Sequence, residues 1–311
     1  TRDWSAEMFE SLELEPELFP KTFEGTAVNG TVSDLAAVAT GLQAGTPVVG
    51  GGGDQAANGV GVGAIEPGVV AVSIGTSGVV FAASATPVVE PEGRLHAFCH
   101  ALPDTWHLMG VMLSAAGSYR WFKDELAPGL DFADLDQAVS EIRPGADGLV
   151  FLPYLTGERT PHPDPEARGA FVGLTVRHGL GHMTRAVMEG VAFGLRDSVD
   201  LMARQLDLGE VRVSGGGASS PVWLQVVADV LDRPVRVVGT AESAAHGAAI
   251  LAAAGTGGFA SVAEACNAAV ELGDIIEPSS SAAAYDDVYG VYRDLYPALR
   301  ESFHRLTGLD S

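Results

Sequence analysis

The chain has 311 residues, 47% of them hydrophobic, which is enough for one large or two small domains with a sizeable core. Its 40 acidic and 18 basic residues give a net charge of −22, which argues against nucleic acid and anionic membranes as partners. No apolar run reaches membrane-spanning length, no signal peptide is visible, and two cysteines without paired spacing suggest neither a disulfide scaffold nor a zinc site. We therefore expect a soluble cytoplasmic protein.

The acidity has two explanations. Lys21 and Lys123 are the only lysines in the sequence. A salt-adapted source would explain both the missing lysines and the acidic surface, because salt screens the repulsion among like charges. A GC-rich genome that favours arginine, combined with ordinary acidity, is the alternative.

Apolar periodicity predicts a mixed α/β fold. Strands are expected near residues 47–50, 68–74, 79–84, 106–112, 148–152, 169–174, 211–214 and 235–238. Helices are expected near residues 114–126, 131–142, 181–206, 220–231, 244–254, 261–271 and 282–306. Pro297 lies inside the last helical pattern and predicts a kink or a break there.

The first glycine cluster is Val48-Val49-Gly50-Gly51-Gly52-Gly53-Asp54, a short apolar strand that runs into four glycines and one carboxylate. Glycine allows the backbone to approach another group closely. An acid beyond such a turn can face a cleft, which favours Asp54 as a general base. The alternative is ordinary Gly-Asp turn chemistry.

The second cluster, Gly75-Thr76-Ser77-Gly78, lies between two apolar β-rich runs and predicts a hairpin with a four-residue loop. Backbone N–H groups and two hydroxyls in such a loop suit a phosphate. A plain hairpin turn is the alternative.

The third cluster, residues 211–220, predicts a strand, a glycine loop and a helix start, with Ser219 or Ser220 as the N-cap and Pro221 at the first helical position. A helix N-terminus behind glycines is suited to binding an anion or a nucleotide. No segment has the Walker A pattern, so the chain is not a P-loop kinase.

These three clusters, in this order, resemble those of the FGGY carbohydrate kinases. Gly169-Ala170-Phe171-Val172-Gly173-Leu174, followed after a spacer by the helix start at residues 182–189, is similar to a further signature of that family. The resemblance covers nearly the whole chain. It implies an α/β fold with an actin-like ATPase (ribonuclease H-like) domain, in which helices flank a mixed sheet. It also implies a carbohydrate kinase, a transferase that passes phosphate from ATP, with Mg²⁺, to an alcohol group of a sugar.

Within the family, residues 96–110 and 153–162 look like those of xylulose kinases. This favours D-xylulose as the substrate and D-xylulose 5-phosphate as the product. Another FGGY kinase, for gluconate, ribulose or glycerol, remains an alternative. A non-catalytic actin-like nucleotide-binding module is a third one, although such a module would not need Asp54.

The resemblance assigns roles to individual residues. Asp54 matches the catalytic aspartate, which would take the proton of the sugar hydroxyl. The matching nucleotide-binding positions are Gly75 and Thr76 in the second phosphate loop, Gly117 in a further nucleotide-side turn, and Gly216, Gly217 and Ser220 in the adenosine loop. For Gly117, a small-residue helix start is an equal alternative.

Two further groups of residues are assigned structural roles. The spacing of His100, His107 and His162 matches no zinc pattern, so we predict no metal ligands in the protein. Glu158 and Arg159 are expected to form a buried ion pair that fixes a loop, with a catalytic role as the alternative.

One departure from the family pattern concerns the domains. The Asp-x-Gly-Thr phosphate loop of the first FGGY domain is not found upstream of Asp54. We therefore expect residues 1–45 to be the tail of an N-terminal FGGY domain with a linker, and residues 46–311 to be the C-terminal nucleotide-binding domain. Such a chain should be inactive alone, and an apolar surface facing the other domain would favour a homodimer.

Overall fold

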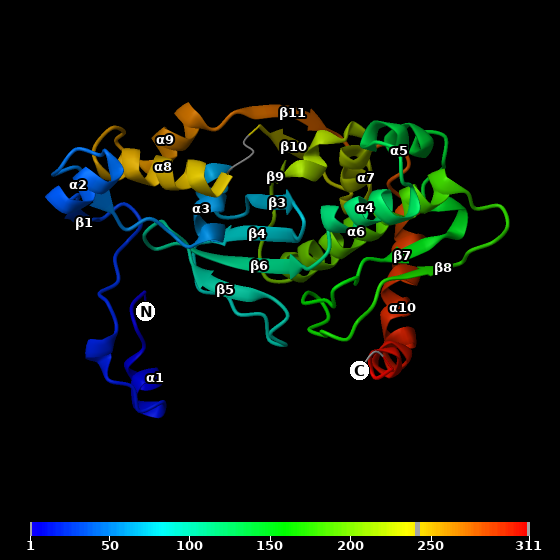
Figure 1. Ribbon diagram of the computed structural model, residues 1–311, viewed down its shortest axis with the longest axis horizontal. Coiled ribbons are helices and arrows are strands. Elements are labelled where there is room, and N and C mark those ends of the chain that lie inside the picture. The colour runs from blue at the N-terminus through cyan, green and yellow to red at the C-terminus, as the bar shows by residue number, and fades with distance from the viewer. Residues whose placement is uncertain (1, 240–242, 310–311) are drawn as a thin grey trace.

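A seven-stranded mixed sheet forms the centre of the computed structural model, which describes residues 2–239 and 243–309 (Figure 1). The strand order is β11-β10-β9-β3-β4-β6-β5, with parallel pairing of β9 to both β3 and β10 and antiparallel pairing elsewhere. The strands are β3 (Val70–Ile74), β4 (Gly78–Ser84), β5 (His96–Cys99), β6 (Trp106–Met112), β9 (Val211–Ser214), β10 (Val235–Val238) and β11 (Leu272–Ile276).

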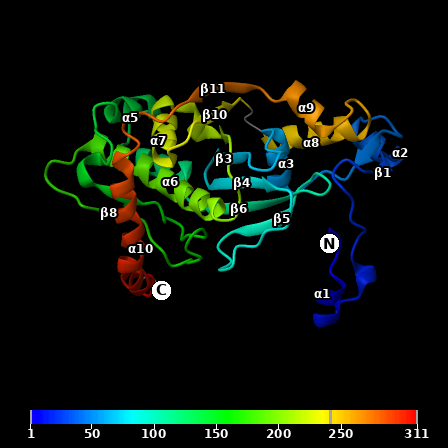
Figure 2. The same ribbon diagram turned by 180° about the vertical axis from the view of Figure 1, so that it is seen from behind.

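Helices cover both faces of this sheet (Figures 1 and 2). One face carries α3 (Asp54–Gly61), α8 (Ser243–Gly255) and α9 (Val262–Ala269), and the other carries α6 (Leu180–Ala203), α7 (Pro221–Leu231) and α10 (Ala284–Thr307). Within β3, Val70 and Val72 belong to the core cluster with α6, whereas Ala71 packs with Phe81 in a cluster on the opposite face. Apolar residues on both faces are expected of a sheet that is buried on both sides.

The remaining elements lie beside α6. They are α4 (Ala116–Trp121), a π-helical turn η2 (Phe122–Leu126), α5 (Phe132–Val139), and the hairpin of β7 (Val150–Leu152) and β8 (Ala170–Val172). Single 3₁₀ turns occur at η1 (Pro16–Leu18), η3 (Ala146–Gly148) and η4 (Gly216–Ser219). Among the helices of the described part of the chain, none is both long and apolar enough to span a membrane.

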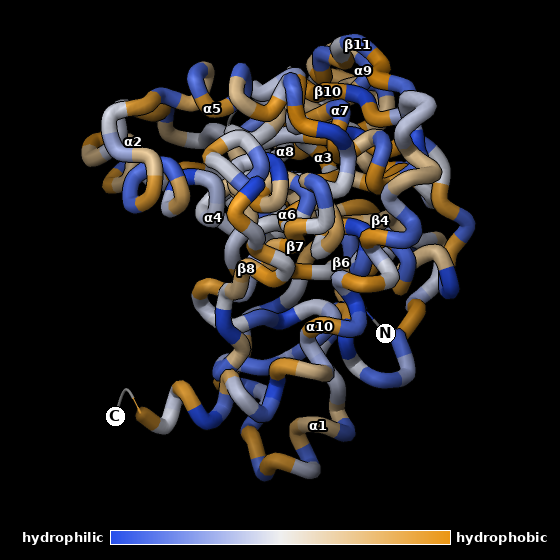
Figure 3. The backbone as a smooth tube through the Cα atoms, turned by 90° about the vertical axis from the view of Figure 1, so that its right-hand side faces the viewer, coloured by the Kyte–Doolittle hydropathy of each residue, from blue (hydrophilic) through white to orange (hydrophobic). Residues whose placement is uncertain are grey.

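The N-terminal segment contains α1 (Ala6–Ser11), β1 (Val28–Thr31), α2 (Asp34–Thr40) and β2 (Pro47–Val49). β1, α2 and β2 lie beside the end of α8, whereas the part with α1 projects from the body (Figure 1). Apolar residues recur along α1 and its flanks although this segment stands apart from the core (Figures 1 and 3). Arg2 ties its start to the body by donating to Glu24 (2.6 and 2.7 Å) and to the carbonyls of His100 and Leu102 (both 2.9 Å).

Helices α3 and α8 cross with their backbones almost in contact. A Cβ added to Gly247 would lie 1.8 Å from the carbonyl oxygen of Ala57, and one added to Gly61 would lie 1.8 Å from that of Ser243. No side chain fits at such a distance, so the crossing requires glycine at both positions.

The expected elements are largely confirmed, and four expectations need correction. Helix α3, which begins with Asp54, was not predicted, and neither were α1, α2, β1, β5 and β11. The β3–β4 loop has three residues, because Gly78 already pairs with Ile74. Helix α10 is continuous through Pro297, so a break there is wrong, whereas a kink stays a prediction. Helices α5 and α9 are shorter than expected, since they end at Val139 and Ala269.

Candidate functional site

The β3–β4 loop is held by the segment that opens α4. The N–H groups of Ala115 and Gly117 donate to the carbonyl of Thr76 (2.9 and 3.1 Å), and that of Ala116 donates to the carbonyl of Gly75 (2.8 Å). Gly75, Thr76 and Gly117, which were predicted from separate motifs, are therefore adjacent in the structure. The carbonyl groups of Gly75 and Thr76 thus point toward the start of α4.

The third glycine cluster folds as predicted. β9 ends at Ser214, Gly215 takes φ +90°, and η4 leads into α7. Ser220 is the N-cap of α7, with its Oγ accepting from the N–H of Trp223 (3.1 Å), and Pro221 is the first helical residue. The N-terminus of an eleven-residue helix thus lies directly behind the glycine loop, where its dipole favours an anion.

A cavity of about 460 Å³ lies between the glycine loop and α4. Its volume is within the range of small-molecule sites. One wall is aromatic and apolar, with Tyr119 packed edge-on against Trp223 (5.3 Å between ring centroids) and tilted against Phe132 (5.1 Å). The residues that line the cavity are Ala116, Tyr119, Arg120, Phe132, Ala133, Asp136, Gly216, Gly217, Ser219, Ser220, Pro221 and Trp223.

The two adjacent glycines of this loop differ in the space that a side chain would have. A Cβ on Gly217 would lie 2.4 Å from Cγ2 of Ile74, so the fold itself requires glycine there. A Cβ on Gly216 would meet none of the described atoms within 4 Å. Packing therefore does not explain Gly216, whereas a ligand that approaches the backbone would. At Gly75 the nearest atom would be 3.5 Å away, an ordinary contact, so this position is also open.

Asp54 lies at a second, smaller cavity. Its carboxylate is exposed at the N-terminus of α3, where it accepts from the backbone N–H of Gln55 (2.8 Å) and from the Gln55 side chain (3.3 Å). The cavity has a volume of about 210 Å³ and is lined by Asp54, Gln55, Asn58, Ser73, Ser214, Gly215, Ser243 and Ala244.

The two cavities share one loop. Ser214 and Gly215 face the smaller cavity, and Gly216, Gly217 and Ser220 face the larger one. Gly75, Thr76 and Gly117 line neither cavity, although they join α4 to the β3–β4 loop.

Sequence reasoning missed most of the lining. Tyr119, Phe132 and Asp136 come from α4 and α5, and the Tyr119 hydroxyl donates to Asp136 (2.9 Å). No motif marks them, because the helical pattern that contains them is that of an ordinary packed helix. Ser73, at the end of β3 just before the predicted Gly75, could have been found from its position.

His100 and His107 are buried in the core, whereas His162 is half-buried. His107 stacks on Phe81 (4.4 Å), and burial lowers the pKa of His107 to about 3 and that of His100 to about 4. A separate group, Asp164, Glu166 and His304, has ligand atoms within 4.8 Å of one another. In that group, His304 Nε2 already lies 2.8 Å from Asp164 Oδ2, which fastens α10 to the loop at residue 164.

The expected ion pair between Glu158 and Arg159 is wrong. Arg159 is exposed, and the described residues contain no salt bridge between the two side chains. Glu158 is buried and accepts from the backbone N–H groups of Leu113 (3.0 Å) and Arg159 (2.7 Å). Burial raises the pKa of Glu158 to about 8.

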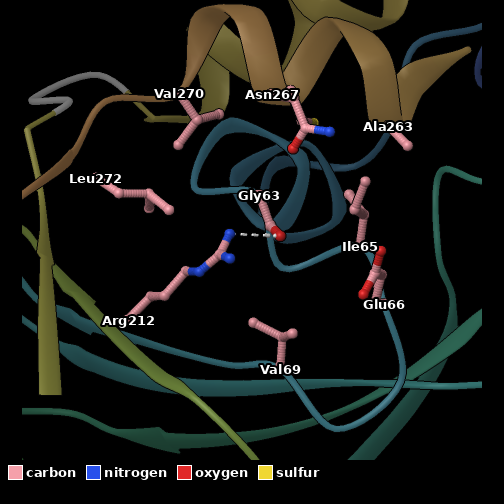
Figure 4. A pocket seen from close by; sticks show the side chains of 10 residues that line it. Gly63, Ile65, Glu66, Val69, Arg212, Ala263, Asn267, Val270 and Leu272 are labelled. Atoms are coloured by element: carbon pink, nitrogen blue, oxygen red, sulfur yellow. Dashed lines mark hydrogen bonds between the residues drawn. The ribbon is translucent and has the colours of Figure 1, made fainter. Parts of the chain in front are cut away.

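A third cavity, of about 250 Å³, lies between β9, α9 and the segment after α3, and contains none of the predicted site residues (Figure 4). Arg212 donates there to the carbonyls of Val62 (2.9 Å) and Gly63 (2.7 Å) and pairs with Glu210 (3.1 Å). Because these contacts occupy its guanidinium, we assign Arg212 a structural role.

Comparison with known proteins gives matches over nearly the whole chain. The model of the FGGY family of carbohydrate kinases, C-terminal domain, matches residues 70–256, and the model of the N-terminal domain matches residues 1–61. The chain is 44% identical over 230 residues to the xylulose kinase of Escherichia coli K12, which is 74% of this chain and 47% of that protein. It is 35% identical over 268 residues to the gluconokinase of Bacillus subtilis, which is 82% of this chain and 52% of that one.

The fold is similar to that of solved kinases. A crystal structure named as a "xyloylose kinase" from Brucella ovis has a TM-score of 0.87 and 38% identity, over 96% of this chain and 61% of that one. The chain thus spans about half to three fifths of the length of these relatives.

Proposed function

The chain belongs to the FGGY family of carbohydrate kinases and has their actin-like ATPase fold, and from this premise we propose that it is the nucleotide-binding and base-bearing part of an ATP-dependent sugar kinase. The observation that carries this proposal is Gly216. Its open backbone faces a cavity with an aromatic wall on one side and the N-terminus of α7 on the other. An adenosine with attached phosphates has the matching combination of a flat ring and an anion.

In the proposed complex, the adenine packs against Tyr119 and Phe132, and the backbone of Gly216 and Gly217 approaches the adenosine. The N–H groups of Gly75 and Thr76 meet the phosphates. Phosphoryl transfer depends mostly on such positioning and on neutralising charge at the phosphates. Asp54 takes the proton of the attacking sugar hydroxyl.

Mg²⁺ is part of this proposal, since it neutralises the phosphate charge during the transfer. The donors around the smaller cavity fit it, because Mg²⁺ prefers oxygen ligands and keeps several waters. Besides the Asp54 carboxylate, this cavity has the hydroxyls of Ser73 and Ser214 and the side chain of Gln55, whose buried Oε1 has no hydrogen-bond partner among the described residues.

We propose D-xylulose as the sugar, in view of the 44% identity to a xylulose kinase. Gluconate is the alternative that the gluconokinase similarity supports. A non-catalytic nucleotide-binding module is disfavoured by Asp54, because an exposed carboxylate beside a phosphate site would repel a nucleotide unless it had a chemical role. Turnover with D-xylulose, gluconate, ribulose and glycerol separates these possibilities.

We also propose that residues 1–45 belong to an N-terminal FGGY domain and residues 46–311 to the C-terminal one. Leu35 and Val38 on α2 are 81% and 87% exposed, which supports a covering partner such as that domain or a second copy in a homodimer. A single domain cannot close a cleft over the sugar, so the chain alone should bind nucleotide without phosphorylating sugar.

The test is Asp54→Asn in an enzyme in which this chain is joined to a complete N-terminal FGGY domain. Sugar-dependent ADP release should fall at least about a hundredfold, or about 2.7 kcal/mol, as expected for loss of a general base. Asp34→Asn is the matched control, because Asp34 is likewise an exposed aspartate at the first position of a helix. Near-normal turnover by the Asp54 variant would refute the role of this residue.

A further inference from the structure

The segment of residues 113–117 holds every residue of the β3–β4 loop. Its N–H groups bind the carbonyls of Gly75 and Thr76, and the Oγ of Ser77 donates to the carbonyl of Leu113 (3.2 Å). The position of this loop relative to the glycine cavity is therefore set by where residues 113–117 lie.

A second loop, residues 156–160, holds this segment from its other side. β5 pairs with β6 only as far as Met109. Beyond that point the edge of β6 is taken by Thr160, whose N–H donates to the carbonyl of Val111 (2.9 Å) and whose Oγ1 accepts from the N–H of Val111 (3.1 Å). Thr156 Oγ1 lies 2.9 Å from Ser114 Oγ.

Glu158 is the central contact of this second loop. It is 3% exposed, and its Oε1 accepts from the N–H groups of both Leu113 and Arg159. The other carboxyl oxygen, Oε2, is buried without a hydrogen-bond partner among the described residues. Leu113 is thus bound on its N–H by Glu158 and on its carbonyl by Ser77, so a single residue joins the buried carboxyl to the phosphate loop.

We propose that Glu158 is a positioning residue, which through Leu113 sets the geometry of the Gly75–Ser77 loop for the phosphates of a bound nucleotide. This inference rests on the proposed function. Glu158 does not touch the nucleotide and acts only through the backbone of its neighbours. Removing its acceptor oxygen leaves two N–H groups unsatisfied, and the loop geometry is then no longer enforced.

The protonation state of Glu158 gives this role a measurable signature. The groups that face it are Asp197 on α6, Arg159 on its own loop, Tyr154, and Tyr292 on α10. Burial and the nearby Asp197 raise the pKa of Glu158 to about 8, whereas Arg159 and the two N–H donors lower it. Above this pH a buried negative charge forms at the contact with Leu113, beside the phosphate loop, and repels an anionic ligand. Gln keeps the acceptor oxygen without this titration.

The experiment compares Glu158→Gln, Glu158→Ala and Thr156→Val with the unmodified chain. ADP with Mg²⁺ is titrated calorimetrically from pH 7 to 9.5, and hydrogen exchange is followed at the amides of residues 75–78 and 113–117. Val262→Ala, a change of a buried residue on α9 that belongs to a different core cluster, controls for general destabilisation.

Near pH 7, Glu158→Ala should weaken ADP binding about tenfold, as two unsatisfied N–H groups would predict, and speed exchange in both segments. Glu158→Gln should bind like the unmodified chain at pH 7. Between pH 7 and 9.5, affinity should fall about fivefold in the unmodified chain and stay constant in Glu158→Gln, a change at the lower end of typical coupling between sites. The affinity of Thr156→Val should lie between those of Glu158→Ala and the unmodified chain, and Val262→Ala should bind ADP normally when folded.

Equal affinity and equal exchange in the folded Glu158→Ala and unmodified chains would overturn the inference, and so would identical pH profiles of Glu158→Gln and the unmodified chain. If the unmodified chain bound no ADP, the proposed function would fail and the link to phosphates with it. The exchange data would still decide whether Glu158 fixes the loop.

Discussion

Gly216 and Gly217 are neighbours in one loop, and the structure predicts opposite consequences for filling them. In Gly217→Ala, the new Cβ would lie 2.4 Å from Ile74 Cγ2 and 3.2 Å from the Trp223 ring. Carbon atoms need about 3.5–4.0 Å, and both neighbours are fully buried, so they have little room to move. Overpacking of this kind typically costs about 1–3 kcal/mol, which we expect as the loss in free energy of unfolding.

In Gly216→Val, by contrast, the new Cβ meets no described atom within 4 Å, so the free energy of unfolding should change by less than about 0.5 kcal/mol. The branched side chain would project into the 460 Å³ cavity, where the adenosine is proposed to lie. ADP affinity should then fall at least about tenfold, or 1.4 kcal/mol.

The assay pairs urea unfolding with calorimetric titration of ADP and Mg²⁺ on both variants. The reasoning requires that Gly217→Ala lose stability and that Gly216→Val lose affinity without losing stability. A folded Gly216→Val chain with unchanged ADP affinity would place the nucleotide elsewhere. A Gly217→Ala chain as stable as the original would show that the packing argument is wrong.

Four further outcomes are expected. Glu158 has a pKa of about 8 in the folded chain and about 4.5 in the unfolded one, so the original chain loses free energy of unfolding as the pH rises between these values. The free energy of unfolding of Glu158→Gln should therefore rise by roughly 4 kcal/mol relative to the original between pH 4.5 and 8. Burial lowers the pKa of His107, so the original chain loses free energy of unfolding as the pH falls below 6.5. The free energy of unfolding of His107→Phe relative to the original should therefore be about 2 kcal/mol higher at pH 5 than at pH 7.5. Gly247→Ala should destabilise the chain by at least about 1–3 kcal/mol in urea, because its Cβ would meet the α3 backbone. ADP titrated in 0.1 M and 1 M KCl should bind at least as tightly at the higher salt, since screening weakens repulsion by the −22 charge.

Local chemistry made some parts of this fold predictable. Ser220 and Pro221 are a strong helix-start signal, because a hydroxyl that caps free N–H groups and a fixed φ both favour that position, and α7 begins there. The β3–β4 hairpin was found for a similar reason, since two β-rich apolar runs flank a glycine turn.

Other elements escaped prediction because their patterns are weak or depend on tertiary contacts. α3 begins with Asp54 after four glycines and contains two more, so its local helix propensity is low. It forms where Gly61 allows its backbone to lie against α8 and Gly59 allows it to lie against Phe81 of β4. The side chains of β11 are mostly exposed, so this strand is held by its backbone pairing with β10 and not by a buried apolar face.

The sequence predicted the glycines that line the candidate cavity, but not the side chains from α4 and α5 that line it opposite them. Glycine clusters stand out in a sequence, and they usually mark a turn or a place where the backbone approaches another group closely. Which of them leaves space for a ligand is a question of distances, and only the structure separates Gly216 from Gly217. The Glu158 contact was misjudged because Arg159 is next to it in sequence, whereas the acceptor is used by the backbone of Leu113, 45 residues away.

An acidic chain that binds an anionic ligand has to supply local attraction without basic side chains. Among the described residues that line the two cavities, Arg120 is the one basic side chain. The attraction must therefore come mainly from backbone N–H groups at the glycine loops and from the N-terminus of α7, with Mg²⁺ in the proposed complex. These dipoles act at contact distance and are scarcely screened by salt, whereas the repulsion by the −22 net charge acts over the Debye length of about 10 Å at 0.1 M salt. Glycine loops thus do more in this protein than let the backbone approach a ligand closely. Their N–H groups attract phosphate regardless of the negative charge on the protein surface.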